Sequence, residues 1–386
     1  QACADLVPAP LAENPPRFAP LRPGGSGACL FTSGSTGTPK GVLIAQDDLV
    51  RRAFAEIDSF NLQSDDVLLN VLPFSFDVGL NQLLSGLLAG ATIVLSESWL
   101  GADLCKAVQE HGVTGISGVP AVWRGMLTAG QHFDTHGEHA SLRFITLSGG
   151  DLGGNELGKL PALAPGVDII KTYGQTETFR SAWLAPKDFS ARPSSVGQPF
   201  PGVKFYIVSE HGGECAPGEV GEIVHTGLGT MQGYLDEAND SKLRPNPFRG
   251  KNGPAEWAVF TGDYGFVDAE GFLYLKGRRD TMLKVSGNRV YPQEIVQQIL
   301  QIEAIAEAQM IGANDAKGNT RIVAFVLPRA NMDLDSRRLR MELANRLPAY
   351  MVPGEIRAVA QFPRTATGKT DVKALYALLN SEAAVQ

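Results

Sequence analysis

The feature that most constrains the fold is a regular alternation of short apolar runs and helical patterns between residues 28 and 170. Strands are predicted at Ala28–Thr32, Val67–Leu72, Ala91–Leu95, Val113–Ser117, Leu142–Leu147 and Val167–Lys171. Helices are predicted at Asp47–Ser59, with Asp47 or Asp48 as the N-cap, and at Leu80–Leu88, Ala102–His111, Pro120–Ala129 and Asn155–Leu160. Strands that alternate with helices predict an α/β domain built on a largely parallel sheet.

The pattern changes at residue 196, where strands and turns follow one another without helices. Strands are predicted at Val203–Ser209, Val220–Thr226, Ala258–Thr261, Gly265–Asp268 and Gly271–Leu275. Beyond Asp280 the sequence predicts helices at Tyr291–Glu303, Leu334–Leu347 and Asp371–Asn380 and a strand at Thr320–Pro328. We therefore expect four parts: a linker or remnant of a missing region (1–27), an α/β part of a large domain (28–195), its β-rich subdomain (196–279), and a small mobile α+β C-terminal domain (280–386).

Composition excludes several classes of function. The chain is 44% hydrophobic and 19% charged, which is typical of a globular protein, and no apolar stretch is long enough to cross a membrane. A formal charge of −7 without a basic run argues against a nucleic-acid partner. The four cysteines show no C-x-x-C pairing, so neither a zinc site nor a disulfide framework is indicated and a cytoplasmic location is expected.

The segment Phe31–Gly41, FTSGSTGTPKG, is the first candidate for a ligand site. Its small residues let backbone N–H groups converge on phosphate oxygens, its hydroxyls add donors, and Lys40 supplies a cation. It is not a Walker loop, because Thr38 and Pro39 separate Gly37 from Lys40. By itself, the segment fits either a phosphate site or a polar hairpin loop. Two more polar loops, 148–151 and 173–178, follow predicted strands, and the carboxyl ends of strands are where α/β sheets bind ligands.

Six motifs in order resemble those of the adenylate-forming superfamily, which comprises acyl-coenzyme A synthetases, peptide-synthetase adenylation domains and luciferases. They are the loop 32–41, SGGD at 148–151, YGQTE at 173–177, TGD at 261–263, GRRD at 277–280 and PRTATGK at 363–369. The resemblance extends from Ala28 to Leu378.

This resemblance implies an ATP site built from these loops. The loop 32–41 corresponds to the one that holds the β- and γ-phosphates and the leaving pyrophosphate. Tyr173 packs on adenine, Thr176 meets the α-phosphate and Glu177 holds magnesium, a hard cation that suits a triphosphate. Asp263 accepts hydrogen bonds from the ribose hydroxyls. The other implied nucleotide contacts are Thr32, Ser33, Gly34, Ser35, Thr36, Gly37, Lys40, Gly149, Gly150, Asp151, Gly174, Gln175 and Arg278.

The resemblance also implies the reaction. A carboxylate attacks the α-phosphorus of ATP and releases pyrophosphate; a thiol of coenzyme A or carrier-protein phosphopantetheine then displaces AMP. The implied catalytic residues are Thr176, Glu177 and Lys369, and Lys369 spreads the charge that develops at the reacting phosphorus. Asp280 is the hinge for rotation of the C-terminal domain, which brings Lys284 and Gly287 towards the thiol tunnel.

The acid is less defined. The implied pocket residues are Asp77, Gly79, Ser148 and Trp183, with Phe179 and Trp123 as further walls or as plain core. Phe76-Asp77 resembles the motif of amino-acid-activating members, whose aspartate pairs with the substrate ammonium, but Gly79 replaces the serine that follows it there. A buried Asp77 needs some cation. An amino acid and a non-amino carboxylic acid both stay open.

The short N-terminal region departs from the superfamily, whose members carry sheet strands ahead of the phosphate loop. That part is a separate chain, was removed, or is naturally absent. Without packed strands a large apolar face would be exposed and would favour association. The expected partners are a small-molecule carboxylic acid, a carrier protein and a separate N-terminal chain. A second class of function is a nucleotide-binding fragment without turnover.

Overall fold

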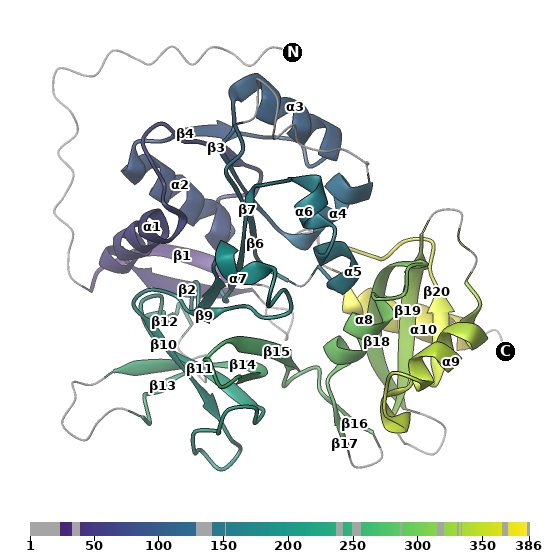
Figure 1. Cartoon of the computed structure of the whole chain (residues 1–386). Helices are drawn as coiled ribbons and strands as arrows, with labels where there is room; N and C mark the ends of the chain where they lie inside the picture. The colour runs from purple at the N-terminus through teal and green to yellow at the C-terminus, as the bar shows by residue number, and fades with distance from the viewer. Residues whose placement is uncertain are drawn as a thin grey trace, which may run out of the picture.

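The computed structural model describes residues 24–32, 39–128, 141–150, 152–236, 242–248, 256–285, 288–314, 320–329, 332, 334–364 and 370–383. The larger part of the chain surrounds a seven-stranded sheet of order β4-β3-β5-β6-β7-β8-β9 (Figure 1). Its first five strands are parallel: β3 (Val67–Asn70), β4 (Thr92–Leu95), β5 (Gly115–Gly118), β6 (Phe144–Leu147) and β7 (Asp168–Tyr173). The antiparallel strands β8 (Ala182–Leu184) and β9 (Gln198–Pro199) complete it. The predicted parallel α/β sheet is confirmed.

Helices cover both faces of this sheet because its side chains alternate between two apolar cores. On one face, α1 (Gln46–Phe60) and α2 (Asp77–Ala89) pack over Leu68, Phe144 and Ile170. On the other, α3 (Gly101–His111), α4 (Pro120–Thr128) and the short α6 (Leu160–Leu163) pack over Leu69, Ile116 and Ile145. Two single-turn helices, α5 (Gly154–Leu157) and α7 (Pro186–Phe189), complete this part.

The first predicted strand does not belong to the parallel sheet. Strand β1 (Ser26–Thr32) pairs antiparallel with β2 (Lys40–Ala45), which also pairs with β12 (Gly233–Tyr234) in a separate three-stranded sheet. The connection between β1 and β2, residues 33–39, is too short for the crossover that parallel strands need. The candidate phosphate loop therefore connects the two strands of a hairpin.

The predicted N-cap of α1 is also wrong. The helix begins at Gln46, its N-cap is Ala45, and no side chain caps it. Asp47 and Asp48 lie in the first turn, where carboxylates favour the positive end of the helix dipole. Asp48 is buried because it pairs with Arg52 and accepts a hydrogen bond from the backbone N–H of Gly229.

A five-stranded antiparallel sheet forms the predicted β-rich subdomain. Its strands are β10 (Val203–Val208), β11 (Gly221–Gly227), β13 (Leu243–Pro245), β14 (Trp257–Val267) and β15 (Leu273–Arg278). The two strands predicted at 258–261 and 265–268 are one strand, β14, whose pairing with β15 shifts register between Tyr264 and Gly265. The Thr261–Asp263 motif therefore lies inside β14, just before this irregularity.

The C-terminal part has its own cores and its own small sheet. Strand β18 (Ile305–Asn314) pairs antiparallel with β19 (Thr320–Pro328), which pairs parallel with β20 (Glu355–Ala358). The helices α8 (Pro292–Ile299), α9 (Ser336–Ala344) and α10 (Val372–Ala383), the 3-10 helix Ala349–Met351 and the hairpin β16 (Leu283–Val285)–β17 (Asn288–Val290) surround it. Strand β18 is absent from the sequence prediction, because alanine, which recurs in this segment, has little intrinsic strand preference. Helix α8 ends at Ile299, before the predicted end at Glu303.

The C-terminal part lies beside α5 and β15 (Figure 1). Glu156 of α5 joins the two parts, since its carboxylate lies 2.9 Å from Nε of Arg124 and 3.7 Å from Nη2 of Arg329. Lys276 of β15 donates to Glu294 of α8 at 2.7 Å. None of the helices in the described ranges is long and apolar enough to cross a membrane. Large apolar side chains are exposed on α2 and at the β4 edge, among them Leu87, Leu88 and Leu95; the expected association stays a prediction.

Candidate nucleotide and acid site

The turn after β7 positions the first group of candidate residues. Gly174 follows Tyr173, and a Cβ at position 174 would lie 1.5 Å from the carbonyl oxygen of Phe179. Phe179 itself has a φ of 57°, a left-handed conformation that few non-glycine residues adopt. The Thr178 hydroxyl accepts a hydrogen bond from the backbone N–H of Gln175 at 3.0 Å. This tight turn allows only glycine at 174 and holds Thr176 and Glu177 in a defined place.

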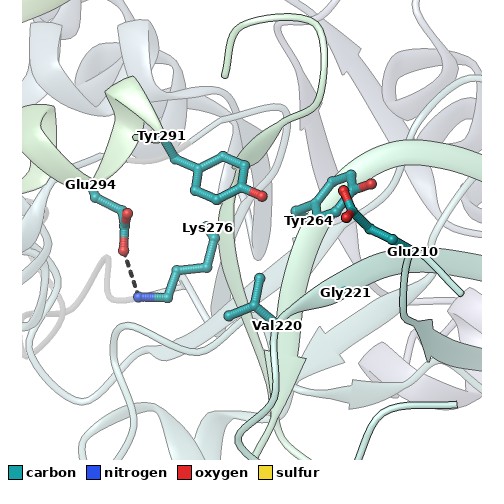
Figure 2. A pocket seen from close by; sticks show the side chains of 7 residues that line it. All are labelled: Glu210, Val220, Gly221, Tyr264, Lys276, Tyr291 and Glu294. Atoms are coloured by element: carbon teal, nitrogen blue, oxygen red, sulfur yellow. Dashed lines mark hydrogen bonds and ion pairs between the residues drawn. The ribbon is translucent and has the colours of Figure 1, made fainter. Parts of the chain in front are cut away.

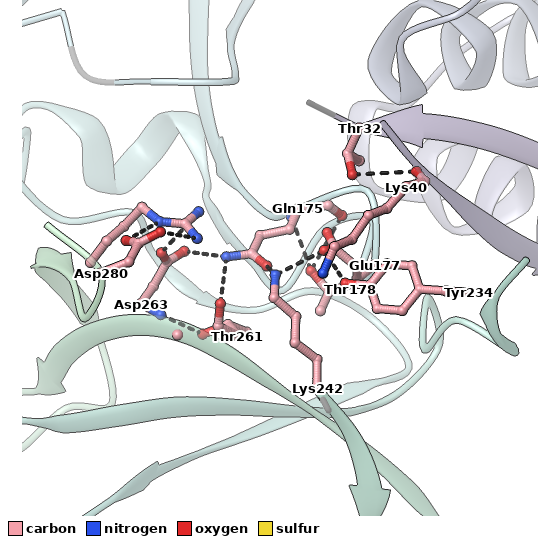
Figure 3. Close-up of polar contacts among 12 residues, drawn as sticks. Thr32, Lys40, Gln175, Glu177, Thr178, Tyr234, Lys242, Thr261, Asp263 and Asp280 are labelled. Atoms are coloured by element: carbon pink, nitrogen blue, oxygen red, sulfur yellow. Dashed lines mark hydrogen bonds and ion pairs between the residues drawn. The ribbon is translucent and has the colours of Figure 1, made fainter. Parts of the chain in front are cut away.

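Glu177 is 6% exposed, and two donors meet one of its oxygens. The Tyr234 hydroxyl donates to Oε1 at 2.7 Å, and Nζ of Lys242 donates to the same atom at 2.8 Å (Figure 3). Burial alone would raise the pKa of Glu177, but the Lys242 ammonium and these hydrogen bonds outweigh burial and hold the pKa below its usual value. Glu177 is therefore a buried, ionised carboxylate.

Asp263 is the second carboxylate of the site, and its side chain is 14% exposed. Its Oδ2 accepts hydrogen bonds from the Tyr173 hydroxyl at 2.8 Å and from Nε2 of Gln175 at 2.7 Å. Arg278 pairs with it across the β14–β15 ladder. Burial raises the pKa of Asp263, and Arg278 and the two donors oppose that effect only in part. Burial also raises the pKa of Tyr173, which keeps its proton and donates.

The two ends of the candidate phosphate loop, Thr32 and Lys40, lie on the side of the site that Glu177 occupies. The Thr32 hydroxyl lies 3.5 Å from the Lys40 carbonyl oxygen, and Lys40 Nζ lies 5.3 Å from the ring centroid of Tyr234 (Figure 3). Tyr234 in turn donates to Glu177. Several candidate residues lie outside the described residues: Ser33, Gly34, Ser35, Thr36, Gly37, Asp151, Gly287 and Lys369.

The glycine pair after β6 has the backbone that a close approach requires. Gly149 has a φ of 73°, and a Cβ there would lie 3.2 Å from Cγ1 of Val119. The Ser148 hydroxyl, just before it, lies 2.7 Å from the Thr172 hydroxyl. Ser148 and Gly149 thus lie at the carboxyl end of β6, next to Thr172 and Tyr173 at the carboxyl end of the neighbouring parallel strand β7.

A layer of buried polar side chains crosses the sheet beneath α2. Asn70, Ser117 and Thr146 occupy neighbouring positions on β3, β5 and β6. Each of these residues lies two positions after Leu68, Gly115 or Phe144 in its strand. Side chains two positions apart in a strand point to the same face, so all three lie on the face that carries the apolar core under α1. Polar residues replace the apolar core where the strands end.

A buried ion-pair network faces this layer from the helices. The Glu56 carboxylate accepts hydrogen bonds from Asn81, Ser85 and Arg180. Several buried polar atoms have no hydrogen-bond partner within the described residues, namely Asn81 Oδ1, Gln82 Oε1, Thr146 Oγ1, and Nε and Nη2 of Arg180. Unpaired buried polar atoms are costly, so this region has hydrogen-bonding capacity to offer to a ligand.

Asp77 begins α2 and is 8% exposed. Its charge acts on Arg52: burial lowers the pKa of Arg52, and the carboxylates of Asp48 and Asp77 oppose that effect. A Cβ at Gly79 would lie 2.5 Å from the Pro73 carbonyl oxygen, so Gly79 serves the close approach of α2 to the preceding chain.

The three aromatic candidates for pocket walls have core partners. Trp123 is fully buried and donates from Nε1 to the Thr146 carbonyl oxygen at 3.1 Å. Phe179 is buried beneath Phe200. Trp183 lies opposite Thr172 in the β7–β8 ladder and contacts Phe200 edge-on, with ring centroids 6.3 Å apart. Both Trp123 and Phe179 are buried, and whether either also borders the acid pocket stays a prediction.

The hinge and thiol-tunnel candidates lie on or near the domain connection. Asp280 accepts a hydrogen bond from Nε of Arg278 at 3.0 Å. Lys284 is exposed on β16. On either side of the Lys369 segment, Arg364 and Thr370 form a bridge, and both contact Glu307.

Sequence reasoning missed Tyr234, Lys242, Glu56, Asn81 and Arg180. Lys242 and Glu177 are 65 positions apart, and no local pattern marks either Lys242 or Tyr234. Arg180 lies three positions after the last residue of the YGQTE motif, but only tertiary structure shows that it pairs with Glu56.

A cavity of about 310 Å³ lies elsewhere, between the β-rich sheet and the C-terminal part (Figure 2). It is lined by Glu210, Val220, Gly221, Tyr264, Lys276, Tyr291 and Glu294. No residue of the six motifs lines it, so it is separate from the candidate site.

The residues present fit a magnesium ion held mainly by its substrate. The described residues contain no group of three or more His, Cys, Asp or Glu side chains placed to hold a metal. Magnesium bound with nucleotides usually takes one or two carboxylates, and phosphate oxygens and water fill its other positions. Glu177, a single ionised carboxylate beside the phosphate loop, meets this requirement.

The class of protein follows from the fold and the site together, and it is the class of adenylate-forming proteins. The defining features are the sheet with loops at the carboxyl ends of its strands, the β-rich subdomain, the small C-terminal domain and this site. Family models described as "AMP-binding enzyme" and "AMP-binding enzyme C-terminal domain" match residues 7–235 and 294–369. The chain belongs to the AMP-binding enzyme family, as the motifs predicted.

Two curated relatives are similar over most of this chain. Indoleacetate–CoA ligase of Aromatoleum aromaticum is 32% identical, over 90% of this chain and 66% of the relative. Dimodular nonribosomal peptide synthase of Bacillus subtilis is 30% identical, over 96% of this chain and 16% of the relative. The chain thus spans less than two thirds of either protein.

A solved structure is similar in fold as well. O-succinylbenzoate coenzyme A synthetase of Bacillus subtilis, in complex with ATP and magnesium ion, superposes with a TM-score of 0.78 at 28% identity. The match covers 91% of this chain and 70% of that one.

Proposed function

We propose that this chain activates a carboxylic acid with ATP, releases pyrophosphate, and transfers the acyl group from the resulting adenylate to a thiol with release of AMP. The observation that carries this proposal is the convergence of two carboxylates, the buried Glu177 and the partly buried Asp263, with three cationic side chains, Lys40, Lys242 and Arg278 (Figure 3). Cations suit the phosphates, and a paired carboxylate suits the vicinal hydroxyls of a ribose.

The first half-reaction forms a bond between a carboxylate oxygen and the α-phosphorus and breaks the bond from that phosphorus to the pyrophosphate oxygen. The chain positions the two reactants and neutralises charge, without a covalent intermediate on a side chain. Lys40 and the hydroxyls of the loop 32–41 hold the leaving pyrophosphate, Thr176 holds the α-phosphate, and Lys369 stabilises charge on the attacked phosphoryl group. Magnesium, held by Glu177, neutralises phosphate charge when bound.

The nucleoside contacts follow the same geometry. Asp263 holds the ribose hydroxyls, Tyr173 and the Ser148–Gly150 segment border the adenine, and Arg278 bridges the ribose side to the phosphates. Gly149 supports this assignment because its left-handed backbone lets the main chain approach a flat base.

For the second half-reaction we propose a thiol acceptor, either coenzyme A or a carrier-protein phosphopantetheine. The small domain (280–386) turns about Asp280 and brings Lys284 and Gly287 to the thiol. The hydrogen bond from Arg278 to Asp280 supports this hinge, because it ties the domain connection to the nucleotide site. Names of the relatives allow either acceptor, since one is a CoA ligase and the other a peptide synthase.

The buried polar layer supports an acid that carries hydrogen-bonding groups over a purely hydrocarbon one. Asn81, Thr146 and Arg180 have unused hydrogen-bonding atoms. A hydrocarbon chain against them would leave these atoms unpaired.

An amino acid is the second candidate substrate, and one observation favours it. The buried charges between α1, α2 and the turn at 180 are the carboxylates of Asp48, Glu56 and Asp77 and the guanidiniums of Arg52 and Arg180. Asp77 is 8% exposed at the start of α2, and a substrate ammonium beside it would form a largely desolvated ion pair. The nearby guanidinium of Arg52 argues against an amino acid, because it would repel the substrate ammonium.

Carboxylate-dependent exchange of labelled pyrophosphate into ATP, screened over amino, aryl and fatty acids, tests the proposal. We expect exchange with at least one polar acid. Nucleotide binding without exchange for any acid would instead support a nucleotide-binding fragment without turnover. A separate N-terminal chain is a further proposed partner. The three described cysteines are unpaired, which supports a cytoplasmic location.

A further inference from the structure

Lys242 occupies a central place in the site, although no motif includes it. Its ammonium donates to Oε1 of Glu177 at 2.8 Å and to Oε1 of Gln175 at 3.1 Å. Gln175 then donates from Nε2 to Asp263 at 2.7 Å and to the Thr261 carbonyl oxygen at 3.1 Å. A continuous chain of hydrogen bonds thus connects the two carboxylates of the site (Figure 3).

The chain has only one possible direction of donation. A lysine ammonium can only donate hydrogen bonds, so Lys242 must contact the side-chain carbonyl oxygen of Gln175. The amide nitrogen of Gln175 then points towards Asp263. If the Gln175 amide were reversed, two donors would meet at Lys242 and two acceptors would meet at Asp263. Lys242 therefore sets the orientation of Gln175, and Gln175 sets the place of Oδ2 of Asp263.

The same ammonium also orients Glu177. Lys242 and Tyr234 both donate to Oε1, so within the described residues the other oxygen, Oε2, has no side-chain donor. The Lys242 side chain is only 25% exposed, so its interaction with a nearly buried carboxylate is weakly screened. Together these contacts leave one oxygen of Glu177 for a cation bound with the phosphates.

We propose that Lys242 is a positioning residue that couples the phosphate end of the nucleotide site to its ribose end. It orients Glu177 at one end and, through Gln175, Asp263 at the other. This proposal rests on the proposed function, because it takes the ligand of the site to be a nucleotide.

The test measures binding by calorimetry with three probes: ATP with magnesium, ATP with a chelator, and 2′,3′-dideoxy-ATP with magnesium. In Lys242→Met we expect binding of magnesium–ATP to weaken at least about tenfold, since a charge-assisted hydrogen bond to each of two groups is lost. Two ratios of affinities report on the two carboxylates: the ribose ratio compares ATP with dideoxy-ATP, and the magnesium ratio compares ATP with and without magnesium. We expect both ratios to become smaller in Lys242→Met, because both carboxylates lose their orientation.

Three further variants separate coupling from other effects. Gln175→Leu should reduce the ribose ratio and leave the magnesium ratio largely intact, and Lys242→Met combined with Gln175→Leu should reduce the ribose ratio no further than either change alone. Lys276→Met is the matched control, because Lys276 makes a similar ion pair with Glu294 at 2.7 Å outside the site. Lys242→Arg, which keeps the charge, should restore the magnesium ratio more than the ribose ratio.

The coupling is overturned if Lys242→Met leaves the ribose ratio at its original value, whatever happens to the magnesium ratio. If Lys242→Met fails to fold, the Gln175→Leu and Lys242→Arg variants decide by the same ratios. Failure of the proposed function is distinguishable, because it would appear as no binding of ATP by the unmodified chain or as binding without pyrophosphate exchange.

Discussion

Arg278 lies directly across the β14–β15 ladder from Asp263, with Nη1 3.8 Å from Oδ1, and its Nε also donates to Asp280 at 3.0 Å. One guanidinium thus faces both the proposed ribose contact and the proposed hinge. Strand β15 was predicted to end at Leu275, and its extension to Arg278 creates this relationship.

Asp263→Asn tests the ribose side. We expect ATP binding to weaken by about tenfold or more, because the ionised acceptor is lost. The folded pKa of Asp263 is raised from 3.8, so above pH 3.8 the folded protein binds this proton more tightly than the unfolded chain does, and the unfolding free energy falls as pH rises. The variant should lack this decline. Urea unfolding from about pH 4 to pH 7 checks it, and identical slopes for both proteins would contradict the assignment.

His225 predicts a loss of stability in acid. It is fully buried, its Nε2 lies 3.0 Å from the Leu228 carbonyl oxygen, and burial lowers its pKa from 6.5 to about 3. Between these values the unfolded chain binds more protons, so the unfolding free energy falls as pH drops below 6.5. From pH 6.5 to pH 5 the loss is roughly 2 kcal/mol.

The measurement for His225 is urea unfolding of the unmodified chain and of His225→Asn at several pH values. The variant should lose stability at neutral pH and show a flatter profile in acid. His211→Gln is the control, because His211 is exposed. An equally steep profile in His225→Asn would rule out this residue as the source.

Thr146→Val tests whether the polar layer serves the acid. The Thr146 hydroxyl is buried without a hydrogen-bond partner among the described residues, so its removal should leave the free energy of unfolding unchanged or raise it by up to about 1 kcal/mol. Activation of polar acids, measured as pyrophosphate exchange, should decline relative to apolar acids of similar size.

The comparison for Thr146→Val is Thr114→Val, because the Thr114 hydroxyl donates to Asp66 at 2.6 Å. That variant should lose roughly 1–3 kcal/mol of stability without a change in acid preference. If Thr146→Val alters stability alone, the layer is structural.

Lys369→Ala tests the two-step assignment. We expect adenylate formation to be lost, because the change removes the cation that we propose for the reacting phosphorus. Thioester formation from a supplied acyl-adenylate should be mostly retained, since the proposed rotation brings Lys284 and Gly287, not Lys369, to the thiol. Single-turnover assays of each half-reaction check this, and equal losses in both would contradict rotation about Asp280.

The sequence by itself determined the layered part of the fold. Runs such as Leu142–Leu147 (LRFITL) and Val167–Lys171 (VDIIK) are short and mostly apolar, which is typical of strands buried in a parallel sheet, and the structure places them as β6 and β7. The ordered motifs likewise determined the family. Both inferences rest on local signals, because each apolar run, each turn glycine and each motif occupies only a few consecutive residues.

Only the tertiary structure decided how these pieces meet. It moved β1 from the parallel sheet into a hairpin with β2 and revealed β18 between α8 and β19. It also brought Lys242 to Glu177 and Arg180 to Glu56. Such pairs are separated by 65 and 124 positions, and their energy comes from burial and charge that exist only after the strands have packed. A local sequence pattern cannot predict such a contact, because the strength of the contact depends on the exclusion of water by distant parts of the chain.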